Sequence, residues 1–341
     1  MTFRASGLLQ AAVIGYGSYG RFHVRKYRSF PDVAICGIAD TNPARRAAAK
    51  AAYPDIPVHT DVDELLAAQL PQLASVAVPA SAHHAVAGRL LERGVHVLVE
   101  KPLADSRVRA MDLLQLARRR KRILQPGHVE RFNHTLAELR AHVREPVYME
   151  SRRLVPWTGR GGDVDVVLDL MIHDIDLLLN LFDSPVMDIQ ARGIRLFSGC
   201  WDVANACVVF ANGCVANLTA SRASLRAERR LHVFSHSACA QVDLDDGLML
   251  LHHRDASGGI STRHSLCRHE DPLAAEIAAF VYAVREGREP AVSAEDGFHA
   301  VDIATRIADA MENDDEVISR VAAPMMKPEH AIAWLARLDG R

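Results

Sequence analysis

Three polar side chains suited to proton transfer fall within one short segment, DLMIHDID (169–176). Asp169, His173 and Asp176 occupy positions i, i+4 and i+7, so an α-helix would place all three on one face. A carboxylate one turn from a histidine can orient the imidazole and raise its basicity for general-base catalysis. Two other interpretations fit the same spacing: a metal site, although no second cluster with ligand spacing exists, or a helix face with one structural histidine.

A second reactive pair, Glu100-Lys101, follows the apolar run VHVLV (95–99). The carboxyl end of a parallel strand faces the ligand crevice, although a surface ion pair would have the same sequence. The lysine could donate to a substrate oxygen, or act as base if burial lowers its pKa. Imidazole, with a reference pKa of about 6.5, suits a base at neutral pH better than lysine at about 10.4. We assign His173 as the base and Lys101 as the polarising charge, with exchanged roles as the alternative.

The segment GYGSYG (15–20) has the G-x-G-x-x-G spacing of a dinucleotide-binding turn. An apolar run precedes it, a helical pattern follows, and the next apolar run ends in Asp40, twenty residues after Gly20. In such a turn Gly15 permits the tight bend, Gly17 lets the backbone approach a pyrophosphate, and Gly20 lets the helix lie close to the sheet. Asp40 would accept both ribose hydroxyls and repel a 2′-phosphate, so the sequence favours NAD.

Alternating elements hold these groups in the first part of the chain. Apolar strands are expected at 11–15, 33–40, 73–79, 95–100 and 122–126, and helices at 20–30, 42–52, 62–70, 82–93 and 107–120. Short apolar strands that alternate with helices indicate a parallel sheet covered on both faces, as in a Rossmann domain.

The apolar pattern changes after about residue 145, and between 186 and 253 its period is mostly two. CVVFANGCVANLTAS (207–221) predicts a hairpin with a type I′ turn at Asn212-Gly213. These strands predict a second, α+β domain with an open, mainly antiparallel sheet and helices on one side. Its helices are expected at 166–182, 273–285 and 297–311.

The composition excludes several classes of protein. With 341 residues, 49% hydrophobic and 24% charged, the chain is globular and long enough for two domains. A net charge of −2 gives no electrostatic reason to expect nucleic acid or an anionic membrane, and no apolar run reaches transmembrane length. Six scattered cysteines without a C-x-x-C pair fit a reducing cytoplasm rather than zinc or disulfides. We therefore expect a cytoplasmic protein without a metal.

Together the motifs resemble the glucose–fructose oxidoreductase / inositol dehydrogenase / MocA-like (Gfo/Idh/MocA) family. The matching segments follow the family's order and are GYGSYGRFHVRKY (15–27), VPASAHH (78–84), EKP (100–102), GHVERFN (127–133), DLMIHDIDLLL (169–179) and DPLAAEIAAFVYAVREGREPAVSAEDG (271–297). The resemblance implies an NAD-binding Rossmann domain at 1–126 and a substrate-binding α+β domain at 127–341. It also implies oxidation of a sugar or polyol hydroxyl by nicotinamide, and a dimer or tetramer joined through the C-terminal sheet.

The resemblance also implies roles for individual residues. The catalytic set carried over by position is Lys101, Asp169 and His173. The implied cofactor contacts are Gly15, Gly17, Ser18, Tyr19, Gly20, Asp40, Val78, Pro79, Ser81, His83, Glu100 and Lys101.

Two longer segments, 150–179 and 210–224, closely resemble UDP-N-acetylglucosamine 3-dehydrogenases that supply 3-amino sugars for lipid A. Like that subgroup, the chain has Asp163-Val164-Asp165 where the wider family usually has glycines. The resemblance implies oxidation at C3 of the nucleotide sugar, whose keto product passes to an aminotransferase. The alternatives are a dehydrogenase of a free sugar, polyol or diol, and an NAD-binding regulator, which would be expected to lack the lysine or histidine.

Arginines before the 169–176 segment fit a nucleotide sugar as substrate. Arg152, Arg153 and Arg160 bracket a loop that contains Trp157 and several glycines. Guanidinium groups bind a diphosphate bidentately, and a flexible loop suits closure, although ordinary surface arginines would have the same sequence. The expected substrate contacts are His128, Arg131, Asn133, Arg153, Arg160 and Asp176.

Overall fold

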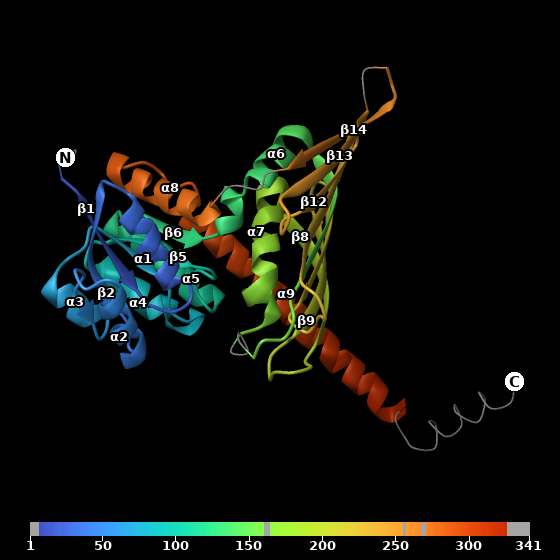
Figure 1. Ribbon diagram of the computed structural model, residues 1–341. Helices are drawn as coiled ribbons and strands as arrows, with labels where there is room; N and C mark the ends of the chain where they lie inside the picture. Colours follow the sequence, from blue (N-terminus) through green and yellow to red (C-terminus); the bar gives the residue numbers. More distant parts are fainter. Residues whose placement is uncertain (1–6, 160–163, 255–256, 267–270, 326–341) are drawn as a thin grey trace, which may run out of the picture.

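The computed structural model describes residues 7–159, 164–254, 257–266 and 271–325, with side chains as far as residue 314. The described elements form two halves, each built around one sheet (Figure 1). None of the described helices is long and apolar enough to cross a membrane.

The N-terminal half contains a six-stranded sheet of order β3-β2-β1-β4-β5-β6 in which every pairing is parallel. Its order reverses between β1 and β4, which is where a dinucleotide binds in such sheets. The expected Rossmann arrangement is therefore confirmed. The strands are β1 (Leu9–Ile14), β2 (Val33–Ala39), β3 (Val58–His59), β4 (Leu73–Val76), β5 (His96–Glu100) and β6 (Leu124–Gly127), and the helices are α1 (Gly20–Ser29), α2 (Pro43–Ala52), α3 (Val62–Ala68), α4 (Ala80–Glu92) and α5 (Arg107–Arg120).

The second half contains an eight-stranded sheet of order β14-β13-β12-β11-β7-β10-β9-β8. Its pairings are antiparallel except that of β7 with β10, which confirms an open, mainly antiparallel sheet. The strands are β7 (Pro146–Leu154), β8 (Val186–Ile194), β9 (Val203–Phe210), β10 (Val215–Ser221), β11 (Glu228–Ser235), β12 (Ala238–Asp243), β13 (Leu248–Arg254) and β14 (Ile260–Leu266). The helical elements after β6 are η1 (Val129–Phe132), α6 (His134–His142), η2 (Val167–Met171), α7 (Ile172–Leu181), α8 (Pro272–Glu286) and α9 (Ala294–Met325).

The hairpin predicted between β9 and β10 is present, but its turn differs from the expected type I′. Phe210 N donates to the Cys214 carbonyl, so three residues form the loop. A type I′ turn needs positive φ at both central residues, whereas only Gly213 has it (φ 85°) and Asn212 does not. The extra residue Ala211 lets glycine alone take the left-handed position.

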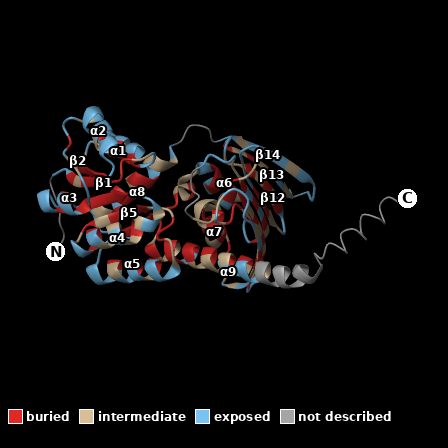
Figure 2. Cartoon of the chain, turned by 90° about the horizontal axis from the view of Figure 1, so that it is seen from below, coloured by how far each residue is buried: buried red, intermediate tan, exposed pale blue. Residues whose placement is uncertain are grey.

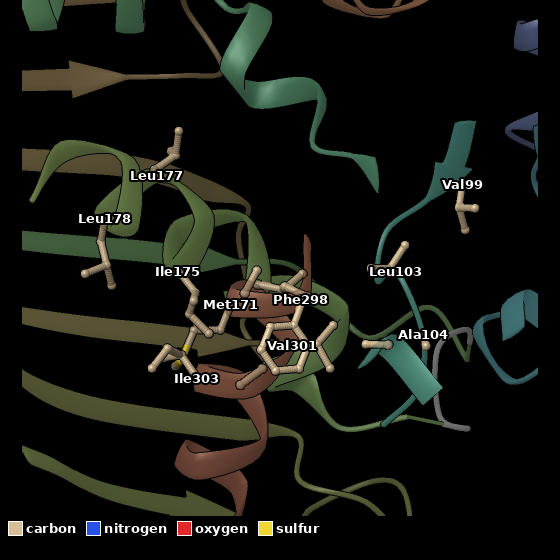
Figure 3. Packing of buried hydrophobic residues seen from close by; sticks show 14 of the residues in the cluster. Val99, Leu103, Ala104, Met171, Ile175, Leu177, Leu178, Phe298, Val301 and Ile303 are labelled. Carbon is tan, nitrogen blue, oxygen red and sulfur yellow. The ribbon is translucent and has the colours of Figure 1, made fainter. Parts of the chain in front are cut away.

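The last two helices fasten the halves together. Ile277 and Phe280 of α8 pack in the same core as Tyr27 of α1, so α8 lies in the N-terminal half although it follows the second sheet. Figure 3 shows Phe298 and Val301 of α9 among side chains from both halves. Burying each such side chain stabilises the fold by about 1.5–3 kcal/mol. Buried residues continue along α9 between the halves (Figure 2).

Candidate active site

In the turn after β1, neighbouring backbone leaves no room for a side chain at the first and third glycines, but leaves room at the middle one. Gly15 has φ +94°, and a Cβ there would lie 2.4 Å from the Ala77 carbonyl oxygen. A Cβ on Gly20 would lie 1.8 Å from the carbonyl oxygen of Gly15. A Cβ on Gly17 would meet only the Arg45 guanidinium, at 3.8 Å. Backbone packing thus demands two of the glycines, and Gly17 leaves the backbone open to a ligand.

The surroundings of this turn fit a dinucleotide. The first turn of α1 has no side-chain cap and no acidic residue, so its positive dipole end is not neutralised there. The Asp40 carboxylate accepts from the backbone N–H of Tyr16 and of Asn42, each at 2.7 Å. Because a carboxylate offers about four lone-pair sites, Asp40 keeps acceptor capacity for ribose hydroxyls.

The second expected cofactor segment, between β4 and α4, contains exposed and buried parts. Pro79 and Ser81 are exposed and Val78 is half-buried, so these three can line a ligand. His83 is only 1% exposed, and its ring nitrogens lie 2.7 Å from the Pro102 carbonyl oxygen and 2.9 Å from that of Val78. His83 therefore ties the loop to the segment after Lys101 instead of lining it.

Replacing Gly17 by valine is expected to weaken NAD binding at least about tenfold while the protein stays folded. The new side chain would project into the space where a phosphate approaches, and its Cβ would meet no backbone atom within 4 Å outside the neighbouring residues. Isothermal titration with NAD and a thermal melt measure the two effects. Gly20→Val is the contrasting variant, because its Cβ overlaps the Gly15 carbonyl, and it should also lower the melting temperature. Unchanged NAD affinity in Gly17→Val would contradict this assignment.

Lys101 joins the two halves at the end of β5. Its Nζ donates to the backbone carbonyl of Asp169 and to Asp169 Oδ1, the latter at 3.1 Å. The lysine side chain is 13% exposed and that of Asp169 is 29% exposed. The carboxylate therefore positions the ammonium group at the junction between the halves.

The expectation that Asp169 orients His173 is wrong. Asp169 is bonded to Lys101, and His173 Nδ1 is buried without a hydrogen-bond partner among the described residues. The physical reason is local: Val167–Met171 form a π-helical turn, not the start of one regular α-helix. Its wider turn changes the phase between Asp169 and the residues that follow, so spacing in the sequence no longer gives a shared face.

The environment of His173 favours its neutral form. Burial lowers the pKa of this imidazole well below its ordinary value, and the positive charges of Arg153 and Lys101 lower it further. A neutral imidazole is a proton acceptor at physiological pH. The role of His173 as base remains a prediction that this environment supports.

Two expected substrate contacts, Arg131 and Asp176, bind each other instead. Arg131 donates from Nε and Nη2 to the Asp176 carboxylate, with N–O distances down to 2.6 Å, and its Nη1 lies 3.2 Å from Asp296. Asp176 is 1% exposed. Both groups are thus already paired inside the protein, where bidentate geometry compensates for lost hydration.

The expectation that Arg153 binds a diphosphate is also wrong. Arg153 is 3% exposed and donates to both oxygens of Asp174, at 3.0 Å each, and to Glu130 at 3.0 Å. It is the centre of a buried ion-pair triad between β7, α7 and η1. Arg160 lies outside the described residues.

The remaining two expected substrate contacts come from the GHVERFN segment. Asn133 is the N-cap of α6, where its side chain accepts from the Thr135 N–H at 3.0 Å; its contact with substrate stays a prediction. His128 is 1% exposed, and neither ring nitrogen has a hydrogen-bond partner among the described residues. Burial lowers the pKa of His128, so this ring is neutral. Its contact with substrate stays a prediction.

The sequence patterns did not predict a polar network that involves Glu100, the residue before Lys101. His23 of α1 contacts Glu100 Oε1 at 2.8 Å and Ser75 Oγ at 3.0 Å, and Tyr27 contacts the same Ser75 at 2.8 Å. Burial raises the pKa of Glu100, but the His23 hydrogen bond and the Lys101 charge outweigh it and lower the pKa overall. The available signal was a histidine on the apolar stripe of α1, four residues before Tyr27.

Glu276 of α8 is buried within electrostatic range of this network. It is 0% exposed, and neither carboxyl oxygen has a hydrogen-bond partner among the described residues. Burial raises its pKa well above the ordinary value, and the negative charges of Glu100 and Asp176 raise it further. Burial in the folded protein therefore favours the protonated, neutral form of Glu276.

Replacing Glu276 by glutamine is expected to stabilise the protein increasingly as pH rises. A raised folded-state pKa means that this carboxyl's stability is complete below about pH 4.5 and is lost as pH rises through the folded pKa. The loss is about 1.4 kcal/mol per pH unit within that window, and glutamine avoids it. Thermal melts at several pH values between about 5 and 8 test this, with exposed Glu286→Gln as the matched control. A pH-independent difference would show that Glu276 is not buried as an acid.

Among the described residues, no group of three or more His, Cys, Asp or Glu side chains could hold a metal ion. The ammonium group that the structure fixes at the junction is that of Lys101, held by Asp169.

Comparison with known proteins also indicates a dinucleotide-binding oxidoreductase, and the matches cover most of the chain. Residues 9–128 match the profile described as "Oxidoreductase family, NAD-binding Rossmann fold", and residues 120–239 match "GFO/IDH/MocA C-terminal domain". UDP-N-acetylglucosamine 3-dehydrogenase of Acidithiobacillus ferrooxidans is 36% identical over 286 residues, which cover 82% of this chain and 90% of that protein. A crystal structure of that enzyme superposes with a TM-score of 0.83 at 34% identity, covering 89% of this chain and 98% of the other.

More distant relatives share the architecture. Myo-inositol 2-dehydrogenase of Thermotoga maritima is 24% identical, covering 85% of this chain and 92% of that protein. An Agrobacterium radiobacter oxidoreductase, solved with NAD⁺, L-tartaric acid and magnesium, superposes with a TM-score of 0.79 at 17% identity, covering 90% of this chain and 97% of the other. At that identity the likeness shows the fold alone.

Proposed function

Because the chain belongs to the Gfo/Idh/MocA family of NAD-binding oxidoreductases, we propose that it oxidises the C3 hydroxyl of UDP-N-acetylglucosamine to the 3-keto sugar. One observation of the structure carries the chemistry: a lysine ammonium, fixed by Asp169 where the halves meet, lies within electrostatic range of His173, whose pKa is lowered so that its neutral form is favoured. The choice of substrate is supported by the relative of that activity, which matches over nearly its whole length.

Lys101 and His173 have different roles because Lys101 carries a positive charge and His173 is neutral. The Lys101 ammonium donates a hydrogen bond to the substrate oxygen and stabilises negative charge that develops on it. Neutral His173 accepts the hydroxyl proton as the carbonyl forms. Asp169 is a positioning residue, because it holds Lys101, whereas the buried Nδ1 of His173 has no hydrogen-bond partner among the described residues. Exchange of the two roles remains the alternative.

NAD is held by the N-terminal half. When bound, it supplies the two-electron acceptor for the hydrogen lost from the substrate carbon. The glycine turn with Ser18 and Tyr19 surrounds the pyrophosphate position, and Asp40 accepts the ribose hydroxyls. Val78, Pro79, Ser81 and Glu100 complete the set along β4 and β5.

The domain organisation that fits this assignment is an NAD-binding part at 1–126 and a substrate-binding part at 127–341, with α8 returning to the first. The protein acts in the cytoplasm on a precursor of lipid A amino sugars, as a homo-oligomer. Support for the oligomer comes from the second sheet: among the described elements, α6, α7 and α9 lie on one side, and the opposite face carries no helix (Figure 1). Light scattering of the purified protein should give a dimer or tetramer.

The test is turnover of a defined substrate. Purified protein with NAD and UDP-N-acetylglucosamine should form NADH and a UDP-sugar lighter by two hydrogens, as seen by mass spectrometry. A parallel reaction contains a keto acid, so that tightly bound NADH can be reoxidised. N-acetylglucosamine and myo-inositol serve as competing substrates. The proposal fails if neither reaction yields the keto sugar, or if a free sugar or polyol is oxidised with higher kcat/KM.

A further inference from the structure

The proposed substrate carries a diphosphate, and the arginines nearest the reacting groups are already used. Arg131 and Arg153 bind buried carboxylates, as described above. Arg222 is 2% exposed and donates to Asp202 at 2.8 Å. Arg152 directly precedes Arg153 on β7, so it points to the opposite face of the sheet, where its Nε lies 3.4 Å from Glu228. Within the part of the chain that the structure describes, we therefore look to another strand for a cation that could bind the diphosphate.

Arg229, near the start of β11, lies on the correct face. It is paired directly with Arg153 across the β11–β7 ladder, and directly paired residues share a face of the sheet. Arg153 reaches Asp174 on α7, so this is the face toward α7 and the N-terminal half. Unlike Arg153, the Arg229 side chain is 45% exposed. Arg229 therefore points to the same side of the sheet as Arg153 and remains accessible to a ligand.

The charge of Arg229 also reaches the reacting groups. It contributes to the lowered pKa of His173, after the larger effects of burial and of the Arg153 and Lys101 charges. It also acts on Tyr19, whose pKa is raised by burial and by Glu100 and lowered by Arg229. Tyr19 belongs to the glycine turn of the other half. Arg229 thus lies within electrostatic range of groups on both sides of the junction.

The present partner of Arg229 is easily replaced. Its Nε lies 3.4 Å from Asp245 Oδ1, and this carboxylate is itself 45% exposed. An exposed ion pair of this kind contributes only about 0–1 kcal/mol, so exchanging it for a ligand costs little. A guanidinium binds phosphate oxygens bidentately, which strengthens and orients the contact.

From this placement we propose that Arg229 anchors the diphosphate of the nucleotide sugar and so selects nucleotide sugars over free sugars. The inference rests on the proposed function, because it concerns the substrate of the same site. Arg229 is a substrate-binding residue here and takes no part in proton transfer.

The experiment compares two adjacent arginines on opposite faces of β11. Arg229→Gln should weaken binding of UDP to the NAD-loaded enzyme by about 10- to 100-fold in calorimetry, and raise KM for UDP-N-acetylglucosamine by a similar factor. The change in kcat should be small, and Arg229→Lys should recover part of the affinity. The matched control is Arg230→Gln, since Arg230 is also paired with an aspartate, at 3.2 Å, and is 48% exposed. It should bind UDP like the wild type.

Each result decides a different question. The inference is overturned if Arg229→Gln binds UDP as tightly as the wild type, or if Arg230→Gln weakens binding equally. In both cases the proposed function stands as long as the wild type oxidises UDP-N-acetylglucosamine. If the wild type neither binds UDP nor oxidises the nucleotide sugar, the proposed function itself fails. Circular dichroism and light scattering of all variants show whether fold and oligomeric state are unchanged.

Discussion

His173→Gln is expected to lower kcat by about 10²–10⁴-fold, the usual contribution of a general base. Glutamine preserves much of the side-chain volume but cannot accept the proton. Because His173 makes no hydrogen bond through Nδ1 in the described part of the chain, the variant should fold normally. Steady-state turnover of UDP-N-acetylglucosamine and a thermal melt measure the two effects. The matched control is His84→Gln, because His84 binds Asp112 near the surface and should be dispensable for turnover.

The pH profile of the wild type tests the same assignment. Since burial and nearby cations lower the pKa of His173, the neutral, active form persists below the ordinary histidine range of about 6.5. The rate should therefore stay level as pH falls through that range and decline only below the lowered pKa. If Lys101 were the base, the rate would instead continue to rise toward alkaline pH. A rising limb in the alkaline range that disappears in Lys101→Met would assign the base to lysine.

Lys101→Met is expected to lower kcat/KM by about 10²–10³-fold, the range for removing one donor to a developing oxyanion. Methionine keeps the apolar stem and removes the ammonium group that Asp169 holds. Lys50→Met, on the exposed side of α2, is the matched control and should retain full turnover.

A second consequence of Lys101→Met separates charge from packing. The Lys101 charge lowers the pKa of His173, so its removal should raise that pKa. The acid limb of the remaining activity should then move to higher pH than in the wild type. A purely structural role for Lys101 would reduce the rate without moving this limb. An unmoved limb would therefore contradict the proposed electrostatic coupling.

Local sequence patterns predicted the elements well where the physics is local. Close backbone contacts require glycine at positions 15 and 20 of the strand–turn–helix unit. The apolar runs of β1, β2 and β5 are largely buried, as expected for strands of a parallel sheet covered on both faces. Exceptions arose where a single residue changes local geometry. The π turn at Val167–Met171 and the three-residue loop at 211–213 both insert one residue into a regular pattern.

Polar partners were predicted poorly, because each partner comes from elsewhere in the chain. Arg153, taken alone, fits a diphosphate, but folding brings Asp174 and Glu130 to it from two other elements. Glu276 resembles an ordinary helical glutamate in the sequence, yet α8 returns to the N-terminal half and buries it beside the Glu100 network. The spacing of residues along a chain carries no information about such encounters.

By itself, the sequence determined the NAD-binding turn, the two-domain class and the family, and it predicted the reactive groups Lys101, Asp169 and His173. These depend on side-chain chemistry and on short-range backbone geometry, which each segment encodes alone. Only the tertiary structure decided which group holds which. In the folded protein Asp169 bonds to Lys101, and Arg153 is buried against Asp174. Arg229, on the same face of the second sheet as Arg153, is half-exposed. Charges are paired or exposed according to the packing of distant elements, and that packing exists only in the folded chain.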